Sequence, residues 1–151
     1  MDLTSIGITF GVTLATVIAA IVIYYLVWGV MPGASVISVT EPPMQTNGLE
    51  DGQAKFMFFY TTWCPWSKKA QQPWASLKEV HKNTPKKYGN TTVIFEEVNA
   101  ENESGKSALY GIKAYPTFKL ETKDKVYEML GKPSVPAFRA FLITVLGQES
   151  T

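Results

Sequence analysis

Cys64 is the residue with the clearest potential for chemistry, because it is the only cysteine among 151 residues. A thiolate is a nucleophile toward disulfides, but a lone cysteine cannot form a disulfide within its own chain. His81 is the only histidine, and one cysteine with one histidine are too few ligands for a structural zinc site. The sequence therefore predicts no metal and no cofactor, and any disulfide of Cys64 would have to form with a second molecule.

Two elements must position Cys64. The segment Lys55–Tyr60 is a continuous apolar run of strand length, typical of a central strand that is buried on both faces. A helix is expected to begin near Pro65, since proline suits the first helical turn, and to run toward Thr84. Cys64 would then lie between a buried strand and a helix. His81 falls near the end of that helix and is expected to be a solvated surface residue.

The other predicted elements alternate between strands and helices. They are a short strand at 36–40, a strand at Thr91–Val98, a short helix at Glu103–Tyr110, a hairpin of strands at Pro116–Glu121 and Lys125–Leu130, and an amphipathic helix at Pro136–Leu146. Strands separated by helices favour parallel pairing, whereas the hairpin adds antiparallel strands. The expected fold class is α/β, with a central mixed sheet flanked by helices.

Charge is distributed unevenly along the chain. Asp2 is the only charged residue among the first 40, and the other 26 Lys, Arg, Asp and Glu residues lie in 41–151. A formal net charge of +1 provides no basic face for nucleic acid. The hydrophobic content of 46% argues against a disordered chain. The sequence thus reads as an apolar leader joined to one ordinary small domain.

The leader is expected to be a transmembrane helix. Leu3–Val30 carries no charge and no proline, and about 20 apolar residues suffice to span a bilayer. Tyr24, Tyr25 and Trp28 gather toward its end, as in an interfacial aromatic belt. The run is too long for the apolar core of a cleaved signal peptide. We therefore expect an uncleaved, single-pass anchor in contact with membrane lipid.

Small residues recur at every fourth position of this leader: Gly7, Gly11, Ala15 and Ala19. Such a stripe lets helix backbones approach closely, which indicates a partner transmembrane helix. No lysine or arginine precedes Lys55, so the positive-inside rule leaves the orientation open.

At this point the residues carry a family resemblance. The strand end Phe58–Tyr60 followed by Trp63–Lys68 (WCPWSK) resembles the active-site segment of the thioredoxin superfamily, nearest its protein disulfide isomerase-like branch. The stretch Tyr110–Thr117 (YGIKAYPT) is similar to the segment that holds the family's cis-proline. Leu130-Gly131 before a last helix matches the family's ending. The resemblance implies a thioredoxin-like fold.

The expected organisation is an anchor at 1–33, a short first strand with a linker at 34–53, and a thioredoxin-like domain at 54–151. The linker is inferred because Glu41–Gln53 is rich in proline, glycine and polar residues. The fold itself is expected to begin near residue 36.

The resemblance also shows what this chain lacks. In the family, a Cys-x-x-Cys pair lies at a helix N-terminus, where the dipole and free N–H groups lower the pKa of the first thiol. Ser67 occupies the second cysteine's position here, so an exchange reaction would stop at a mixed disulfide unless an outside thiol resolves it. Phe58 replaces the buried acid that many dithiol members carry.

Pro116 matches the cis-proline that lies beside the cysteine in this family and presents backbone to an extended peptide. Around it, the resemblance places Trp63, Pro65, Trp66 and Tyr115 at a surface for a peptide or a protein partner.

Three hypotheses for Cys64 remain open: a monothiol that forms transient mixed disulfides, with Ser67 hydrogen-bonded to the thiolate; a leftover cysteine in a binding domain; and a permanent intermolecular disulfide. Loss of the second thiol and of the buried acid favours the second hypothesis. The leading interpretation is a membrane-anchored binding or structural component of an assembly of proteins, in an endoplasmic reticulum-type or virion membrane. The alternative is a membrane-tethered monothiol isomerase-like oxidoreductase or chaperone.

Overall fold

The structure, a computed structural model, describes residues 3–28, 37–43 and 47–150. The chain divides into two compact units, Met1–Ser35 and Val36–Thr151.

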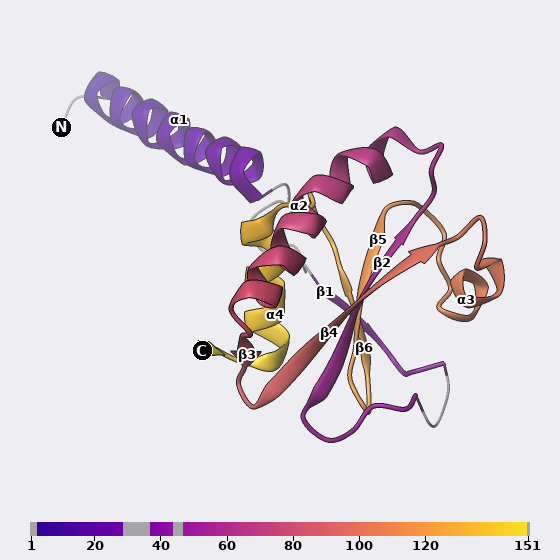
Figure 1. Ribbon diagram of the computed structural model, residues 1–151. Helices are drawn as coiled ribbons and strands as arrows, with labels where there is room; N and C mark the ends of the chain where they lie inside the picture. The colour runs from indigo at the N-terminus through magenta and orange to yellow at the C-terminus, as the bar shows by residue number, and fades with distance from the viewer. Residues whose placement is uncertain (1–2, 29–36, 44–46, 151) are drawn as a thin grey trace. The chain divides into compact units, whose positions relative to one another are not determined.

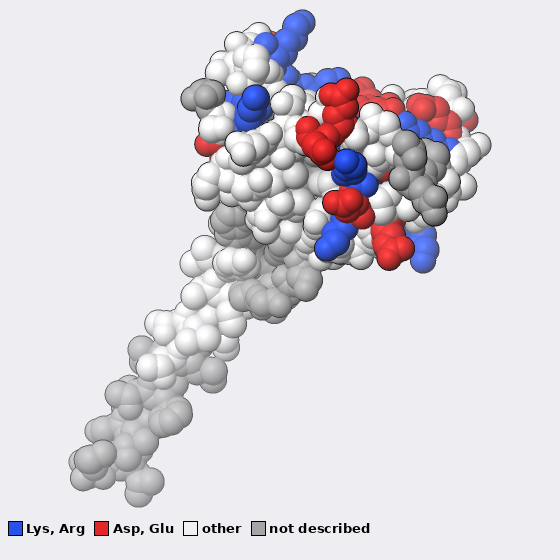
Figure 2. Space-filling view, turned by 90° about the horizontal axis from the view of Figure 1, so that it is seen from below, with Lys and Arg blue, Asp and Glu red and all other residues white. Residues whose placement is uncertain are grey.

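In the first unit, the described residues form one helix, α1 (Leu3–Trp28). It includes the four small residues Gly7, Gly11, Ala15 and Ala19, of which the two alanines are exposed. The surroundings of the two glycines lie outside what is described, as does the last part of the predicted anchor, 29–33. The described atoms of α1 carry no charge (Figure 2). Within the described part of the chain, no helix is both long enough and apolar enough to cross a membrane.

The second unit is built on a mixed sheet of seven strands in the order β1-β6-β5-β2-β4-β3-β7 (Figure 1). The strands are β1 (Ile37–Thr40), β2 (Gln53–Tyr60), β3 (Lys87–Tyr88), β4 (Thr91–Asn99), β5 (Thr117–Glu121), β6 (Val126–Met129) and β7 (Glu149–Ser150). The helices are α2 (Pro65–Asn83), α3 (Ser104–Leu109) and α4 (Val135–Leu146). The predicted α/β class, mixed sheet and thioredoxin-like order of elements are confirmed.

The central strand β2 is paired on both sides. It runs parallel to β4, with Phe58 opposite Glu97, and antiparallel to β5, with Phe58 opposite Phe118. Because successive side chains point to opposite faces of a sheet, an apolar run of this length supplies two cores at once. This explains why β2 lacks the polar alternation of a half-buried strand.

The first core lies between the sheet and the helices α2 and α4. Aromatic rings dominate it: Phe56 packs edge-on to Trp74 with centroids 5.0 Å apart, and Phe58 stacks on Phe118 at 4.9 Å. Phe138 of α4 also contacts Trp74 at 5.9 Å. All five rings are at most 3% exposed, so this cluster fixes the start of α2 relative to the end of β2.

The second core lies on the other face of the sheet and is smaller. It contains Met57, Phe59, Val98, Tyr110 and Val126. The Tyr110 hydroxyl donates a 2.7 Å hydrogen bond to the fully buried Glu121. Burial, followed by the contact with Glu121, raises the pKa of the Tyr110 hydroxyl, so the group stays protonated as a donor.

The C-terminal residues are fixed to the sheet by charge. β7 pairs antiparallel with β3, and Glu149 accepts from both Lys86 and Arg139. Burial raises the pKa of Glu149, but these two hydrogen bonds outweigh it and leave the pKa below its usual range. Two strands of two residues each carry no periodic signal, which is why β3 and β7 were not predicted.

The prediction for His81 was wrong. Its ring is half-buried, with Nδ1 2.8 Å from the Leu77 carbonyl and Nε2 3.0 Å from the Tyr88 hydroxyl. It also packs edge-on to Phe95 at 4.9 Å. Because both ring nitrogens have protein partners, His81 closes the end of α2 over the sheet rather than facing water.

Candidate thiol site

Cys64 lies at the N-cap of α2, directly before Pro65. Its carbonyl accepts the first hydrogen bond of the helix, from the Lys68 N–H at 3.2 Å. Its side chain makes no capping bond, so the Cys64 Sγ is left to face the N–H groups of the first turn. The free thiol is 6% exposed and donates to the Tyr115 carbonyl, with Sγ and oxygen 3.4 Å apart.

The helix start lowers the pKa of Cys64. The largest cause is the backbone N–H of Ser67, and the Ser67 hydroxyl and the Trp66 N–H add to it. Burial acts in the opposite direction and is outweighed. These donors stabilise a negative sulfur at a helix N-terminus, as the thiol chemistry of such sites requires. The site therefore favours the thiolate relative to an ordinary cysteine.

Ser67 is fully buried behind Cys64. Its Oγ accepts the backbone N–H of Thr61 at 3.4 Å, which joins the first turn of α2 to the loop that follows β2. The hydroxyl thus has a structural partner on one side and the thiol on the other. Since it cannot form a disulfide, a mixed disulfide at Cys64 has no resolving sulfur within this chain.

The segment before β5 completes the site from the other side. The Tyr115–Pro116 peptide bond is cis, and the carbonyl that receives the thiol belongs to Tyr115. Tyr115 and Pro116 are both half-buried. The structure therefore brings together Cys64, Ser67, Tyr115 and Pro116, which the chain separates by as many as 52 positions.

The exposed aromatic residues divide into two groups. Trp66 lies 66% exposed and forms one wall of a groove of about 390 Å³. The other lining residues are Lys69, Tyr115, Pro116, Gly131, Lys132 and Pro133. Trp63 is 68% exposed and Pro65 is exposed, but neither lines this groove.

Sequence reasoning missed the groove's far wall, Gly131, Lys132 and Pro133, and the lysine Lys69 on α2. The Gly-Lys-Pro run that begins two residues after the end of β6 marks a loop, but nothing in the sequence places that loop beside α2. The pairing of β6 with β5 does so, because it brings the end of β6 next to the start of β5.

Phe58 occupies the interior beneath the site. It is 1% exposed and stacks on Phe118 and on Tyr60, whose ring centroid is 5.1 Å away. An apolar ring cannot carry a proton, so the proton of Cys64 has no acceptor at this position. The nearest carboxylate in register, Glu97, is held by Trp74 and Lys78 at 3.0 and 2.7 Å.

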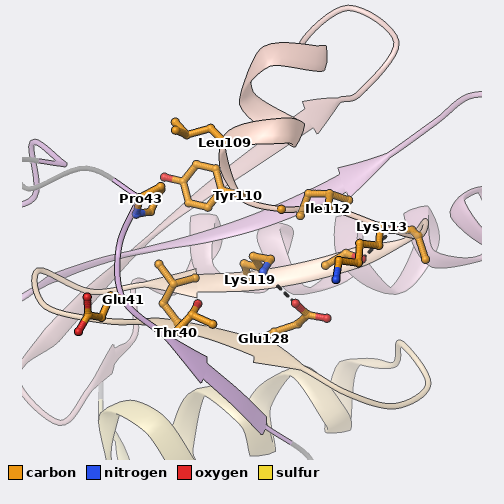
Figure 3. A pocket seen from close by; sticks show the side chains of 13 residues that line it. Thr40, Glu41, Pro43, Leu109, Tyr110, Ile112, Lys113, Lys119 and Glu128 are labelled. Atoms are coloured by element: carbon orange, nitrogen blue, oxygen red, sulfur yellow. Dashed lines mark hydrogen bonds and ion pairs between the residues drawn. The ribbon is translucent and has the colours of Figure 1, made fainter.

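A second hollow, of about 590 Å³, lies over the other face of β5 and β6 (Figure 3). Lys119 and Glu128 cross its floor as an ion pair of 2.8 Å, and Leu109 and Ile112 lie along one side. The lysine ammonium is already neutralised by its neighbour. This hollow shares no lining residue with the groove beside Cys64.

Comparisons with known proteins agree with this geometry. The family model of thioredoxin matches residues 45–143. Among solved structures, human ERp44 is 25% identical with a TM-score of 0.52 over 62% of this chain, which spans 27% of ERp44. The first thioredoxin domain of mouse protein disulfide-isomerase A4 is 19% identical with a TM-score of 0.52, covering 65% of this chain and 66% of that domain's chain. The J-Trx1 fragment of ERdj5 is 18% identical with a TM-score of 0.51, covering 64% and 45%.

The search of curated proteins found no match. The thioredoxin match nevertheless covers about two thirds of the chain, and the similar structures include proteins of the disulfide-isomerase type. Together with the mixed sheet, the cysteine at the N-terminus of α2 and the cis-proline beside it, this match leads to one conclusion: the chain belongs to the thioredoxin family.

Proposed function

We propose that this chain is a monothiol member of the family that holds protein partners at the groove beside Cys64 through a mixed disulfide. The thiolate of Cys64 attacks one sulfur of a partner's disulfide. A new sulfur–sulfur bond forms, the partner's own disulfide breaks, and its other sulfur leaves with the electron pair as a thiolate. No outside oxidant is needed for this step, because the partner's disulfide is consumed.

The observation that supports this proposal is the placement of the thiol. The Cys64 Sγ lies 3.4 Å from the carbonyl of Tyr115, next to the cis bond, and donors from the first turn of α2 lower its pKa. A cysteine kept only by chance would need neither feature. Both serve a sulfur that must ionise beside a bound chain.

Ser67 and Phe58 determine how the reaction would end. Without a second thiol at position 67, the mixed disulfide persists until an external thiol attacks it. Without an acid at position 58, the site has no buried group there to move a proton. The proposed activity is therefore retention of partners, with release by a small thiol or another protein, rather than rapid turnover.

A second candidate function is purely non-covalent binding within an assembly. Two observations favour it: Cys64 is only 6% exposed, and Trp66 next to it is 66% exposed. A large exposed indole contributes contact area that a small, covered thiol cannot. The two functions share the groove and differ in whether the sulfur is required.

We further propose that α1 anchors the domain in a membrane, of the endoplasmic reticulum or of a virion. Support comes from the sequence, which has no charged residue in Leu3–Trp28. As a sequence, the uncharged run Leu3–Val30 is long enough to span a bilayer, which is the basis of this proposal. The stripe that begins at Gly7 and Gly11 would then pack against a partner helix.

The test is to capture a defined disulfide protein. Full-length chain in detergent micelles is incubated with oxidised insulin and free thiols are then blocked, so that adducts can be separated on a non-reducing gel. We expect an adduct for the native chain, none for Cys64→Ser and a reduced amount for Trp66→Ala. A matched control is Trp63→Ala, since Trp63 is equally exposed but lies outside the groove.

The same variants separate the two candidates. If Cys64→Ser forms no covalent adduct yet still binds a natural assembly partner as well as the native chain does, the non-covalent function holds. Equal adduct formation by Cys64→Ser and the native chain would contradict the thiol proposal outright.

A further inference from the structure

Two short motifs of the sequence lie outside the thiol site. The segments Asn90–Thr92 (NTT) and Asn102–Ser104 (NES) each place a hydroxyl two residues after an asparagine, with a residue other than proline between them. This is the acceptor motif for N-linked oligosaccharides. The other three asparagines of the chain, Asn47, Asn83 and Asn99, have no hydroxyl at that position. The sequence thus offers two acceptors.

The fold places both acceptors on exposed turns. Asn90 lies in the turn between β3 and β4, and Asn102 lies in the turn between β4 and α3. Among the described residues, no hydrogen bond holds the side-chain amide of either one. By contrast, the Asn47 amide donates a 2.9 Å hydrogen bond to a backbone carbonyl, and that of Asn99 accepts a 3.0 Å bond from a backbone N–H. A bulky oligosaccharide at either acceptor would therefore displace no hydrogen-bonded group.

The fold does not require a hydroxyl in either motif. Thr92 is exposed near the start of β4, and Ser104 is exposed as the first residue of α3. The fold uses the backbone of Thr92, whose N–H donates to the Gly52 carbonyl at 2.8 Å. The Ser67 and Ser134 hydroxyls, in contrast, accept backbone N–H groups. Both motif hydroxyls thus remain accessible.

The two acceptors lie at opposite ends of β4, next to β3 and to α3 (Figure 1). Because β4 runs parallel to β2, Asn102 stands at the end of the sheet that carries Cys64. The Thr62 hydroxyl, just before the thiol, donates to the Glu101 carboxylate at 2.7 Å. The groove lies toward β5 and β6, on the other side of β2. An oligosaccharide at Asn102 would therefore flank the loop of Cys64 from the side opposite the groove.

The proposed function places the domain in a compartment where such a modification occurs. A mixed disulfide at Cys64 needs partners that carry disulfides, and disulfides form and persist in oxidising compartments such as the endoplasmic reticulum lumen. The same lumen is where asparagines of this motif receive oligosaccharides. Both requirements select one side of the membrane, a choice that the positive-inside rule leaves open for this chain.

We infer that the domain faces the lumen and carries N-linked oligosaccharides at Asn90 and Asn102. This inference rests on the proposed function, because the need for partner disulfides places the domain in that compartment. The donor is an oligosaccharide linked to a lipid pyrophosphate. The asparagine amide nitrogen forms a bond to the first sugar carbon, and the bond from that carbon to the phosphate oxygen breaks. The lipid pyrophosphate leaves with the electron pair, and the amide loses one proton.

The test is translation of the full-length chain in the presence of endoplasmic reticulum microsomes, followed by electrophoresis with and without peptide N-glycosidase. We expect two glycans on the native chain, one on Asn90→Gln, one on Asn102→Gln and none on the double variant. The matched control is Asn83→Gln, since Asn83 is also exposed but has Pro85 in place of the hydroxyl. This control should keep both glycans.

A second set of variants keeps both asparagines. Thr92→Val and Ser104→Ala should each remove one glycan, because they delete the hydroxyl of one motif. Thr92→Ser retains a hydroxyl and should keep both glycans. Glycans that persist when both hydroxyls are deleted would show attachment outside the two motifs and would overturn the inference.

Protease added outside sealed microsomes reports the side of the membrane independently. A protected domain without a glycan would overturn the modification and leave the compartment that the proposed function requires. Digestion of the domain would overturn the lumenal placement and the modification together. The insulin adduct is measured on the same glycosylated chain: its absence, with both glycans present, would contradict the proposed function and leave the assignment of Asn90 and Asn102 standing.

Discussion

At position 67 a hydroxyl occupies the place where a second thiol would complete a redox pair. Ser67 is fully buried in the first turn of α2, and its Oγ accepts the Thr61 N–H. A cysteine differs from serine there by one atom and is a weaker acceptor. The residue thus determines the chemistry of the site while contributing little to its shape.

Ser67→Cys should therefore restore a dithiol pair with Cys64. We expect measurable insulin reduction by this variant with glutathione as the electron source, and almost none by the native chain. The rate should stay below that of dithiol family members because Phe58 supplies no proton acceptor. The weakened bond from Thr61 should cost about 1 kcal/mol of stability.

The matched control is Ser76→Cys, which adds a second thiol to an exposed position of the same helix. This variant should remain inactive in insulin reduction. Activity in both variants, or substantial turnover by the native chain, would show that the site does not depend on position 67.

The ionisation of Cys64 gives a second prediction, which concerns how the alkylation rate of the thiol depends on pH. Folding lowers the pKa of this thiol from the ordinary value of 9.0. The stabilisation that the thiolate provides is therefore present above the pKa of the unfolded chain and is lost as pH falls through the folded pKa. Alkylation by iodoacetamide should reach half its maximal rate at a lower pH in the folded chain than in urea.

Ser67→Ala tests the cause of this shift. The largest contribution to the lowered pKa comes from the Ser67 backbone N–H, which the variant keeps. The pH of half-maximal alkylation should therefore rise only part of the way toward its value in the unfolded chain. A midpoint in the folded native chain at or above that of the unfolded chain would contradict the assignment.

At the scale of elements, the hydrophobic pattern was sufficient to predict strands and helices where burial is periodic or continuous. The run Lys55–Tyr60 predicted β2, and Pro65 predicted the start of α2. The hairpin of β5 and β6 also lay where expected, within one residue at each predicted end. These elements are determined locally, by apolar content and by turn residues.

Elements and sites made by distant pairing could not be predicted in this way. The pairing of β3 with β7 is accompanied by ion pairs of Glu149 with Lys86 and Arg139, which lie far from Glu149 or on another element in the sequence. Likewise, Lys69 and Lys132 are ordinary exposed lysines in the sequence and become neighbours of one groove only through the order of the sheet. The pair of Cys64 and Pro116 was anticipated through a family resemblance, since spacing alone does not bring them together.

The aromatic cluster between α2 and the sheet is the element-scale feature on which the site depends. Trp74 is 1% exposed, packs edge-on to Phe56 and donates from Nε1 to Glu97. Trp74→Ala should lower the free energy of unfolding by about 3–5 kcal/mol. Trp74→Phe should cost less, because it retains most of the packing and loses one hydrogen bond worth about 1 kcal/mol.

Urea unfolding followed by circular dichroism measures both variants. The control is Trp63→Ala, because the Trp63 side chain is 68% exposed. Its free energy of unfolding should change by no more than about 0.5 kcal/mol. A similar loss for Trp63→Ala and Trp74→Ala would show that α2 is not held by this core.

For the whole molecule, the groove and α1 impose different requirements. The groove needs a partner that can approach from the aqueous side, because its lysines and Trp66 are exposed. If α1 anchors the chain as proposed, it lies in an apolar environment instead. Anchoring would restrict the domain to partners at the same membrane surface, which raises their effective concentration at the groove. A groove that binds its partners weakly would be sufficient under such conditions.

The membrane prediction can be tested directly on the whole chain. After expression in a eukaryotic host, membranes are washed with carbonate at high pH, which strips peripheral proteins, and the pellet is probed for the chain. We expect the full-length protein to remain in the pellet, because burying the apolar side chains of Leu3–Trp28 in lipid outweighs any gain from solvation.

A chain that begins at Val36, the first residue of the second compact unit, should appear in the supernatant. Replacing Ala15 and Ala19 with lysine should also release the full-length chain, since charges at the bilayer centre are costly. Release of the native chain by carbonate would refute the anchor, and retention of the shortened chain would place the membrane contact in the domain instead of α1.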